Sequence, residues 1–281
     1  MLNIKALVKL MRPKQWVKNA FVMAPLVFSG LFLSLESVLQ AITATVLFCI
    51  ASSATYILND YKDVEDDRKH PVKSKTRPLA SGDVTKHQAL VLMTLLYGLV
   101  AIGLVIHFDF VVIILCYLAL NVVYTIYLKY QPVLDIFTIA SGFVLRVYTG
   151  TVAISVPLSP WMLVTTFALA LYLAAIKRRQ ELAKNGSSSR NVLNEYSVEL
   201  MDRYAEMSAT CAVIFYSLFV MTSKMDMVLS IPFVLFGLYR YWFVVDSLDG
   251  GESPTDALFS DFQLQTTIIA WVAVCLYTLW P

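Results

Sequence analysis

The sequence predicts an all-α integral membrane protein with nine transmembrane helices and a polar cytoplasmic cap. Hydrophobic residues make up 58% of the 281 residues, charged residues make up 15%, and the mean hydropathy is +0.66. Soluble domains carry about 25% charged residues, so a chain this apolar is typical of a membrane protein. Two further features support the same fold: a series of long apolar segments, and a strong asymmetry of lysine and arginine between the connections.

The apolar segments are spaced along the whole chain. A helix that crosses a bilayer needs about 20 mostly apolar residues. The segments are 17–33, 38–58, 89–106, 110–128, 133–154, 160–176, 207–222, 227–245 and 265–280. The first and the seventh are short, so we expect flanking residues to complete these two helices. Long connections at 59–88, 177–206 and 246–264 alternate with much shorter ones.

Lysine and arginine predict the orientation, because cytoplasmic connections carry an excess of these residues. With the N-terminus inside, nineteen of the 22 lysines and arginines fall on the cytoplasmic side. The opposite side holds only Lys224, and Arg146 and Arg240 lie within segments. An odd number of crossings places the C-terminus outside. All three long connections are then cytoplasmic, and we expect the chain in the inner (plasma) membrane of a bacterium.

The patterns of several other protein classes are missing. The four cysteines stand singly in apolar runs without CxxC or zinc spacing, so we expect buried thiols and no disulfide. The first apolar segment has no A-x-A-like exit and is expected to remain as a span. We find no nucleotide fingerprint, P-loop or Ser-His-Asp set, and expect no nucleic-acid partner. Lipid-facing and partner-facing surfaces look alike, so no oligomeric state is assigned.

An acidic stretch directly follows the second apolar segment. In a helix, Asn59, Asp63 and Asp67 stand four residues apart on one face, and Asp60 lies beside that face. Carboxylates near hydrocarbon are expensive and are usually functional. Hard oxygen ligands of this kind suit Mg²⁺, which also binds the phosphates of a substrate. We interpret these four side chains as ligands of Mg²⁺; the alternative is a solvated acidic connection between two spans.

Cations follow the acidic stretch within ten residues. Arg68, Lys75 and Arg77 are expected to neutralise the phosphate oxygens that the metal leaves free. The alternative is a basic loop that is attracted to anionic lipid. The acidic stretch beside it favours a site that binds a metal–diphosphate substrate.

These two stretches together resemble the first signature of the UbiA superfamily of intramembrane prenyltransferases. They read Asn59-Asp60-x-x-Asp63-x-x-x-Asp67, then Arg77-Pro78-Leu79-x-x-Gly82. Nine spans with a cytoplasmic N-terminus are similar to that family too, and the resemblance covers essentially the whole chain. It implies a single transmembrane domain over residues 1–281. In that fold, helices surround a central cavity that opens sideways to lipid and is capped on the cytoplasmic side.

The second signature of that superfamily differs here. Other members carry a second Asp-rich motif after the sixth span, which holds a second Mg²⁺ on a prenyl diphosphate. This chain has Lys177-Arg178-Arg179-Gln180-Glu181-Leu182 instead. Arg178 and Glu181 are three residues apart and can share a helix face, whereas three consecutive cations cannot all face one cavity. The cations either bind an anion directly or anchor the end of a helix.

Three stretches, 12–19, 177–182 and 250–254, resemble one branch of the superfamily, the decaprenyl-phosphate phosphoribosyltransferases. The resemblance implies Mg²⁺-dependent transfer of 5-phosphoribose from phosphoribosyl diphosphate to a polyprenyl phosphate. Mg²⁺ on Asp60, Asp63 and Asp67 would stabilise the leaving diphosphate. The donor's 5-phosphate needs a separate cationic pocket. The candidates for that pocket are Lys177, Arg178, Arg179 and Arg190, with Glu181 beside them.

Polar residues around the first segment are further candidates. Lys14, Lys18 and Asn19 either line the mouth of the cavity and bind a phosphate, or anchor the helix at the interface beside Trp16. The similarity to the branch favours the first of these interpretations.

Two arginines lie inside apolar segments. Arg146 is in the middle of the fifth segment, where a charge is expected to face the cavity or a buried partner. Asp135 lies eleven residues earlier, about 16 Å along a helix, so the two are not expected to pair. Arg240 lies near the inner end of the eighth segment, within expected reach of a phosphate.

Two other functions are weighed against phosphoribosyl transfer. One is prenyl transfer from a prenyl diphosphate to an aromatic or quinone-precursor acceptor, which needs a second metal site that the sequence does not show. The other is a non-catalytic carrier of lipid phosphates, which intramembrane charges would also serve. A carrier does not explain carboxylates at metal-ligand spacing.

Overall fold

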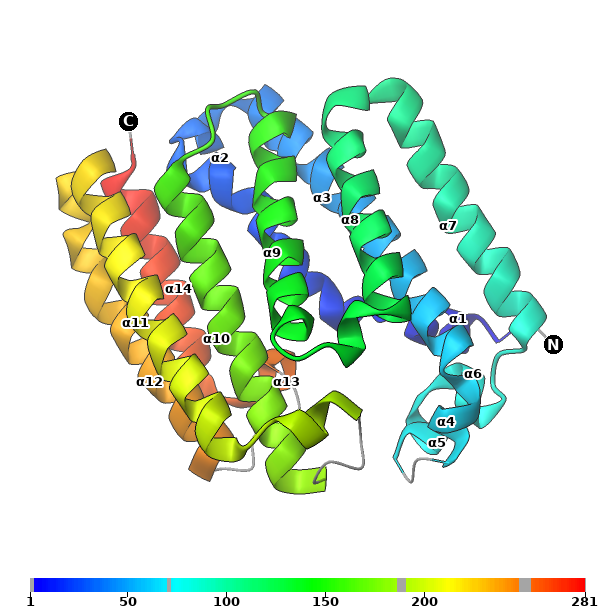
Figure 1. Ribbon diagram of the computed structural model, residues 1–281. Helices are drawn as coiled ribbons and strands as arrows, with labels where there is room; N and C mark the ends of the chain where they lie inside the picture. The colour runs from blue at the N-terminus through cyan, green and yellow to red at the C-terminus, as the bar shows by residue number, and fades with distance from the viewer. Residues whose placement is uncertain (1–2, 70–71, 186–190, 248–253, 281) are drawn as a thin grey trace.

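A computed structural model of the chain describes residues 3–69, 72–185, 191–247 and 254–280, and every element within these ranges is helical. Long helices stand side by side, and several short helices gather at one end of the bundle (Figure 1). The N-terminus lies at the end that carries the short helices, and the C-terminus lies at the opposite end (Figure 1). An odd number of crossings would give this arrangement.

The long helices account for the central seven of the expected segments. They are α3 (Leu35–Lys62), α7 (Lys86–Ile106), α8 (Phe108–Ile126), α9 (Leu134–Ala153), α10 (Pro160–Asn185), α11 (Val198–Ser223) and α12 (Ile231–Ser247), the last preceded by the 3₁₀ helix η6 (Met225–Ser230). Within the described ranges, seven helical stretches are long and apolar enough to cross a membrane. The seventh expected segment is extended as predicted, because Ser197 caps α11 and the helix includes polar residues before position 207.

The first and last expected segments differ from the prediction. The first forms η1 (Pro13–Met23), α2 (Ala24–Phe28) and η2 (Leu31–Leu33). Gly30 (φ 74°) adopts a left-handed conformation between α2 and η2 and interrupts the segment, and Arg12 (φ 55°) adopts one just before η1 begins. The last segment forms α14 (Phe262–Thr278), which has 17 residues and falls short of the usual length. Apolar composition alone therefore does not establish nine regular spans.

Short helices occupy the long connections. They are α4 (Val64–Lys69), α5 (Lys73–Thr76), α6 (Pro78–Ser81) and α13 (Pro254–Ser260), with the 3₁₀ helix η5 (Asn191–Glu195). Two more short elements lie elsewhere: α1 (Ile4–Leu10) precedes the first apolar segment, and the 3₁₀ helix η3 (Leu128–Tyr130) lies in the short connection between α8 and α9. Figure 1 places α4, α5, α6 and α13 at the same end of the bundle. The three long connections therefore share one end, as the sequence predicts.

The outer faces of the bundle are apolar. Val105, Ile269 and Tyr277 are 86%, 69% and 81% exposed, and many other large apolar side chains are exposed on the long helices. Soluble monomers rarely expose apolar surface on this scale. With the length of the helices, this surface identifies an integral membrane protein.

Gly150 allows η1 to pass close to α9. A Cβ atom at this position would lie 1.9 Å from the carbonyl oxygen of Val22 and 3.3 Å from Cδ of Pro25. The obstacle is backbone, which cannot rotate away as a side chain would. The absence of a side chain at Gly150 therefore sets the distance between α9 and the segment that follows Arg12.

We expect Gly150→Ala to lower the free energy of unfolding by about 1–3 kcal/mol or more, because this is the usual cost of overpacking. The measurement is the melting temperature in detergent. Gly98→Ala on α7 is the matched control, because a Cβ atom there meets nothing within 4 Å. The control should be neutral or slightly stabilising, since glycine within a helix costs about 0.5–1 kcal/mol. Equal melting temperatures for both variants would contradict the prediction.

Candidate active site

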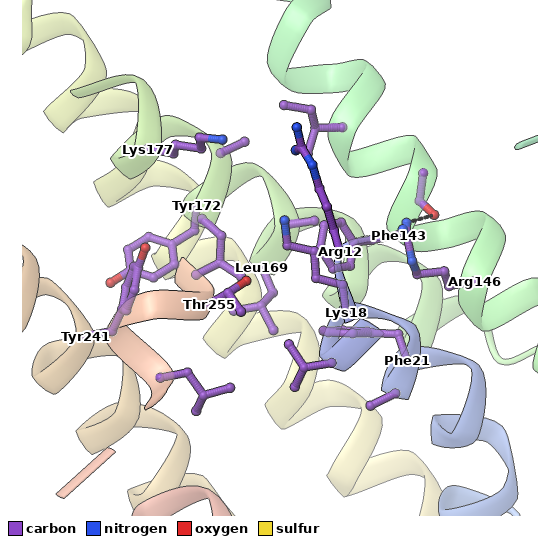
Figure 2. Close-up of a pocket in the computed structure, with 18 of the residues that line it drawn as sticks. Arg12, Lys18, Phe21, Phe143, Arg146, Leu169, Tyr172, Lys177, Tyr241 and Thr255 are labelled. Carbon is purple, nitrogen blue, oxygen red and sulfur yellow. Dashed lines mark hydrogen bonds between the residues drawn. The ribbon is translucent and has the colours of Figure 1, made fainter. Parts of the chain in front are cut away.

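A cavity of about 1350 Å³ lies within the bundle. Its wall includes residues of η1, α3, α8, α9, α10, α12 and α14. Figure 2 shows Arg12 and Lys18 in this cavity, with Tyr172 and Tyr241 on one side and Arg146 on the other. Carboxylates and cations lie together in the part of the wall that the end of α3 and helices α4 and α5 contribute.

The acidic motif stays on one side of the chain although α3 ends at Lys62. The N–H of Asp63 donates to the carbonyl of Asn59, and the N–H of Asp67 donates to the carbonyl of Asp63, both over 2.9 Å. This helix-like spacing continues across the junction between α3 and α4. Asn59, Asp60, Asp63 and Asp67 consequently all line the cavity, as their spacing predicts.

Two arginines hold the carboxylates of this motif. Arg77 Nη1 lies 3.0 Å from Asp60 Oδ1 and also donates to Asp67 Oδ2. Arg12 donates to the same Asp60 oxygen and lies over the ring of Tyr56. The carboxylates of Asp60 and Asp67 are 2% and 6% exposed. The two buried carboxylates therefore converge on one cationic atom.

Asp63 points to a different cation. Its Oδ1 lies 3.3 Å from Nζ of Lys129, at the short connection between α8 and α9, and its side chain is 37% exposed. Within the described ranges, no three His, Cys, Asp or Glu side chains are close enough to hold a metal together. Asp60 and Asp67 nevertheless fit a divalent cation, because their oxygens already meet at one positive charge. Mg²⁺ commonly binds through one or two carboxylates, with water and phosphate as the other ligands.

Half of the predicted site residues that the structure describes, metal ligands included, lie away from this cavity. Its wall includes the predicted residues Lys18, Asn59, Asp60, Asp63, Asp67, Arg77, Arg146 and Lys177. It does not include Lys14, Asn19, Arg68, Lys75, Arg178, Arg179, Glu181 or Arg240. Arg190 lies outside the described residues. The wall also holds cations that the sequence did not single out, namely Arg12, Lys69, Lys73 and Lys129.

Arg178 differs most from its predicted role, because it lies inside the protein and forms ion pairs there. Its Nε lies 2.7 Å from Asp135 Oδ2, its Nη1 lies 2.7 Å from Glu181 Oε2, and its Nη2 donates to the hydroxyl of Tyr124. The side chains of Arg178 and Asp135 are 1% and 0% exposed. The shared face predicted for Arg178 and Glu181 is present, but it joins them to each other. Arg178 does not line the cavity, but Tyr124, which accepts a hydrogen bond from it, does.

Tyr196 extends this cluster to the connection after α10. Its hydroxyl donates to Asp135 Oδ1 over 2.6 Å and accepts from the N–H of Val133. Burial, and then the hydrogen bond to the carboxylate, raise the pKa of Tyr196, so its proton stays in place for this bond. Val133 has a φ of 68°, which is rare for a β-branched residue. The hydrogen bond that Val133 N–H donates to the Tyr196 hydroxyl therefore holds a strained turn at the start of α9.

Other predicted cations pair with carboxylates at the edges of the bundle. Arg240 donates to both oxygens of Asp261, and Arg179 lies 2.7 Å from Asp202 and 2.8 Å from Asp246. Arg68 pairs with exposed Glu65, and Lys14 and Lys75 are exposed. A sequence window cannot reveal these pairs, because most of the partners come from other helices.

Asn19 and Arg146 contact each other deep in the bundle. Asn19 is fully buried; its side-chain oxygen accepts from Nε of Arg146 over 2.9 Å, and its amide donates to Ser52. Asn19 is therefore not at the mouth of the cavity, which corrects the expectation for this residue. Asp135 pairs with Arg178 and not with Arg146, as the distance along the helix predicts.

Arg12 is the functional candidate that the sequence came closest to revealing. It opens the stretch 12–19 whose resemblance to the phosphoribosyltransferase branch is described above, yet only the structure joins it to Asp60. The two residues are 48 positions apart, which hides that contact in the sequence.

Comparison with known proteins agrees with this architecture. Residues 22–267 match the model of the UbiA prenyltransferase family. The chain is 34% identical to the decaprenyl-phosphate phosphoribosyltransferase of Mycolicibacterium smegmatis, over 96% of this chain and 91% of that protein. It is 33% identical to the protein of the same name from Corynebacterium glutamicum, over 95% of this chain and 84% of that protein.

A solved structure of a UbiA homologue from Archaeoglobus fulgidus, bound to DMAPP and Mg²⁺, has the same fold. It superposes with a TM-score of 0.72 and 16% identity, and the match covers 97% of this chain and 98% of that one. Family model, relatives and fold all agree, and the chain belongs to the UbiA prenyltransferase family.

Proposed function

We propose that this membrane protein transfers 5-phosphoribose from phosphoribosyl diphosphate to a polyprenyl phosphate and releases diphosphate. The observation that carries the proposal is the similarity, over nearly the full chain, to two relatives named decaprenyl-phosphate phosphoribosyltransferase. The cavity supports it, because it combines buried carboxylates with several cations and a long apolar wall. One substrate of this reaction is strongly anionic, and the other joins a phosphate to a hydrocarbon chain.

Asp60 and Asp67 would hold Mg²⁺, with Asp63 and Asn59 beside them. The metal would supply positive charge to the departing diphosphate. Arg12 and Arg77 already lie against these carboxylates, so they are placed to donate hydrogen bonds to diphosphate oxygens in the same position. Lys73, 3.9 Å from Asp67, adds a further positive charge.

The chemistry requires little proton transfer. An oxygen of the acceptor phosphate forms a bond to C1 of the ribose, and the bond from C1 to the diphosphate oxygen breaks with its electrons. The attacking oxygen is already an anion, so no strong general base is needed. No histidine lines the cavity within the described residues, which is consistent with this reaction. The contribution of the protein is therefore to position the substrates and to stabilise the leaving group.

The polar end of the bundle is proposed to face the cytoplasm of a bacterium, across its inner membrane. The excess of lysine and arginine in the connections at that end supports this orientation. It would place the N-terminus in the cytoplasm and the C-terminus outside, in agreement with their positions at opposite ends of the bundle (Figure 1).

The proposed function is tested by release of diphosphate from purified protein with Mg²⁺. One reaction contains phosphoribosyl diphosphate and polyprenyl phosphate, and the other contains a prenyl diphosphate and 4-hydroxybenzoate. We expect turnover with the first pair only, and loss of that turnover when EDTA removes the metal. Turnover with the second pair only would establish prenyl transfer to an aromatic acceptor instead. No turnover with either pair would favour a carrier of lipid phosphates.

A further inference from the structure

Lys18 and Arg146 are cavity cations that differ from the others in their partners. Arg12, Arg77 and Lys129, which also line the cavity, each form an ion pair with a carboxylate of the acidic motif. In the described parts of the chain, neither Lys18 nor Arg146 has a carboxylate within ion-pair distance. The cavity therefore has two regions: one with mixed charges at the acidic motif, and one with cations alone.

Arg146 is a buried cation, and some of its N–H groups donate no hydrogen bond to the described residues. Its Nε donates to Asn19, its Nη1 donates to the carbonyl of Gly142 over 2.8 Å, and its Nη2 donates to the hydroxyl of Tyr117 over 3.3 Å. These bonds use three of the five N–H groups of a guanidinium. Three aromatic rings around Cζ, at 4.9 to 5.0 Å, stabilise the charge without neutralising it. An anion in the cavity would neutralise it.

Arg146 also lies deep in the bundle. It is twelve residues beyond the start of α9, which is about 18 Å along the helix axis. The hydrocarbon core of a bilayer is about 30 Å thick. An uncompensated cation at this depth is expensive and usually serves a ligand.

Lys18 lies on η1 and adds a second positive charge to the same region (Figure 2). It forms neither a hydrogen bond nor an ion pair with another side chain of the described residues. All three N–H donors of Lys18 are available to a ligand.

The wall beyond Lys18 is apolar. Along η1, α2 and α14 the cavity is lined by Phe21, Ala24, Val27, Phe28, Trp271 and Cys275. A phosphate held at Lys18 would therefore adjoin a surface that suits a hydrocarbon chain. The donor sugar phosphate has no such chain. The other cavity lysines Lys73, Lys129 and Lys177 lie on α5, on η3 and toward the C-terminal end of α10.

We propose that Lys18 and Arg146 bind the phosphate of the polyprenyl acceptor, a proposal that rests on the function proposed above. The acceptor phosphate then lies on the apolar side of the ribose, and both phosphate groups of the donor lie on the polar side. The acceptor oxygen bonds to C1 while the diphosphate departs toward Arg12 and Arg77. The two regions of the cavity thus separate the nucleophile from the leaving group.

The test is Lys18→Met, with the KM of each substrate measured at saturation of the other. We expect the KM for polyprenyl phosphate to rise by about 10- to 100-fold, the loss typical of a charge-assisted hydrogen bond. The KM for phosphoribosyl diphosphate should stay within about twofold of the wild-type value. Lys18→Arg should restore most of the acceptor affinity. Lys14→Met is the matched control, because Lys14 is an exposed residue of the same helix outside the cavity.

Each other outcome decides the question. A selective rise in the KM for the donor would place the donor's phosphate at Lys18 and overturn the proposal, while the proposed function would stand. Unchanged constants for both substrates would also overturn it. If Lys18→Met does not turn over, binding of polyprenyl phosphate is measured by isothermal titration, and wild-type affinity would overturn the proposal. An inactive wild-type protein with this substrate pair would refute the proposed function itself.

Discussion

Asp60→Asn is expected to lower turnover by at least about 100-fold and to weaken binding of the metal. Changes to residues that merely support metal ligands already cost about 10- to 100-fold, and Asp60 is proposed to be a ligand itself. Its carboxylate is 2% exposed and contacts Arg12 and Arg77. Asparagine keeps the shape of this side chain but removes its charge. The loss should therefore come from chemistry and metal affinity more than from misfolding.

Two quantities are measured for Asp60→Asn. One is turnover, and the other is the affinity for Mn²⁺ in the absence of substrate, monitored by electron paramagnetic resonance. The matched control is Glu65→Gln, which removes one charge from the same acidic stretch. Glu65 is exposed, and its hydrogen bond from Lys86 lowers its pKa, but it does not line the cavity. The control should keep wild-type turnover and affinity. Wild-type Mn²⁺ affinity in Asp60→Asn would contradict the assignment of this ligand.

Arg178→Met is the second change with a large expected effect, on the stability of the protein. Removing one partner of a buried ion pair costs about 3–5 kcal/mol, because the other charge is left without compensation. Here the fully buried carboxylate of Asp135 would keep, among the described residues, only its hydrogen bond from Tyr196. We expect a large fall in the melting temperature in detergent, since each kcal/mol corresponds to roughly 2–4 °C in a protein of about this size.

Arg179→Met is the neighbouring control. Arg179 pairs with Asp202 and Asp246, which are 29% and 51% exposed, and exposed pairs contribute about 0–1 kcal/mol. Adding Asp135→Asn to Arg178→Met should recover part of the lost stability, because it removes the unpaired charge. If Arg178→Met keeps the wild-type melting temperature but loses affinity for the donor, Arg178 binds substrate and the structural interpretation is wrong.

Much of the fold follows from composition, because the physical causes are local. A run of about 20 apolar residues can satisfy its backbone in a bilayer only as a helix. This argument predicted α3, α7, α8, α9 and α10 well, and it predicted that the seventh segment needed its flanks. It did not foresee the interrupted first segment, whose shape depends on left-handed backbone at Arg12 and Gly30. Apolar content is insensitive to such backbone angles.

The residues of the candidate site also fall into two groups: the acidic residues, which the sequence predicted, and the cations, which it could not assign. Spacing in the sequence placed Asn59, Asp60, Asp63 and Asp67 together, because residues four apart share a helix face. The cations were harder to assign, since a lysine or arginine looks the same in sequence whether it faces a ligand or an aspartate. Arg178 and Arg179 were predicted with equal reason, yet one is buried against Asp135 and the other pairs at the edge of the bundle.

The sequence by itself determined the membrane class of this protein, the position of its acidic motif and its resemblance to the UbiA superfamily. Each of these depends on residues that are neighbours in the chain. Only the tertiary structure decided which positive charges remain for a ligand. A cation is neutralised by whatever carboxylate lies within a few ångströms, and in a helical bundle that carboxylate usually comes from another helix. Lys18 and Arg146 have no such carboxylate among the described residues. They are separated by 127 residues in the chain, yet both line the same cavity.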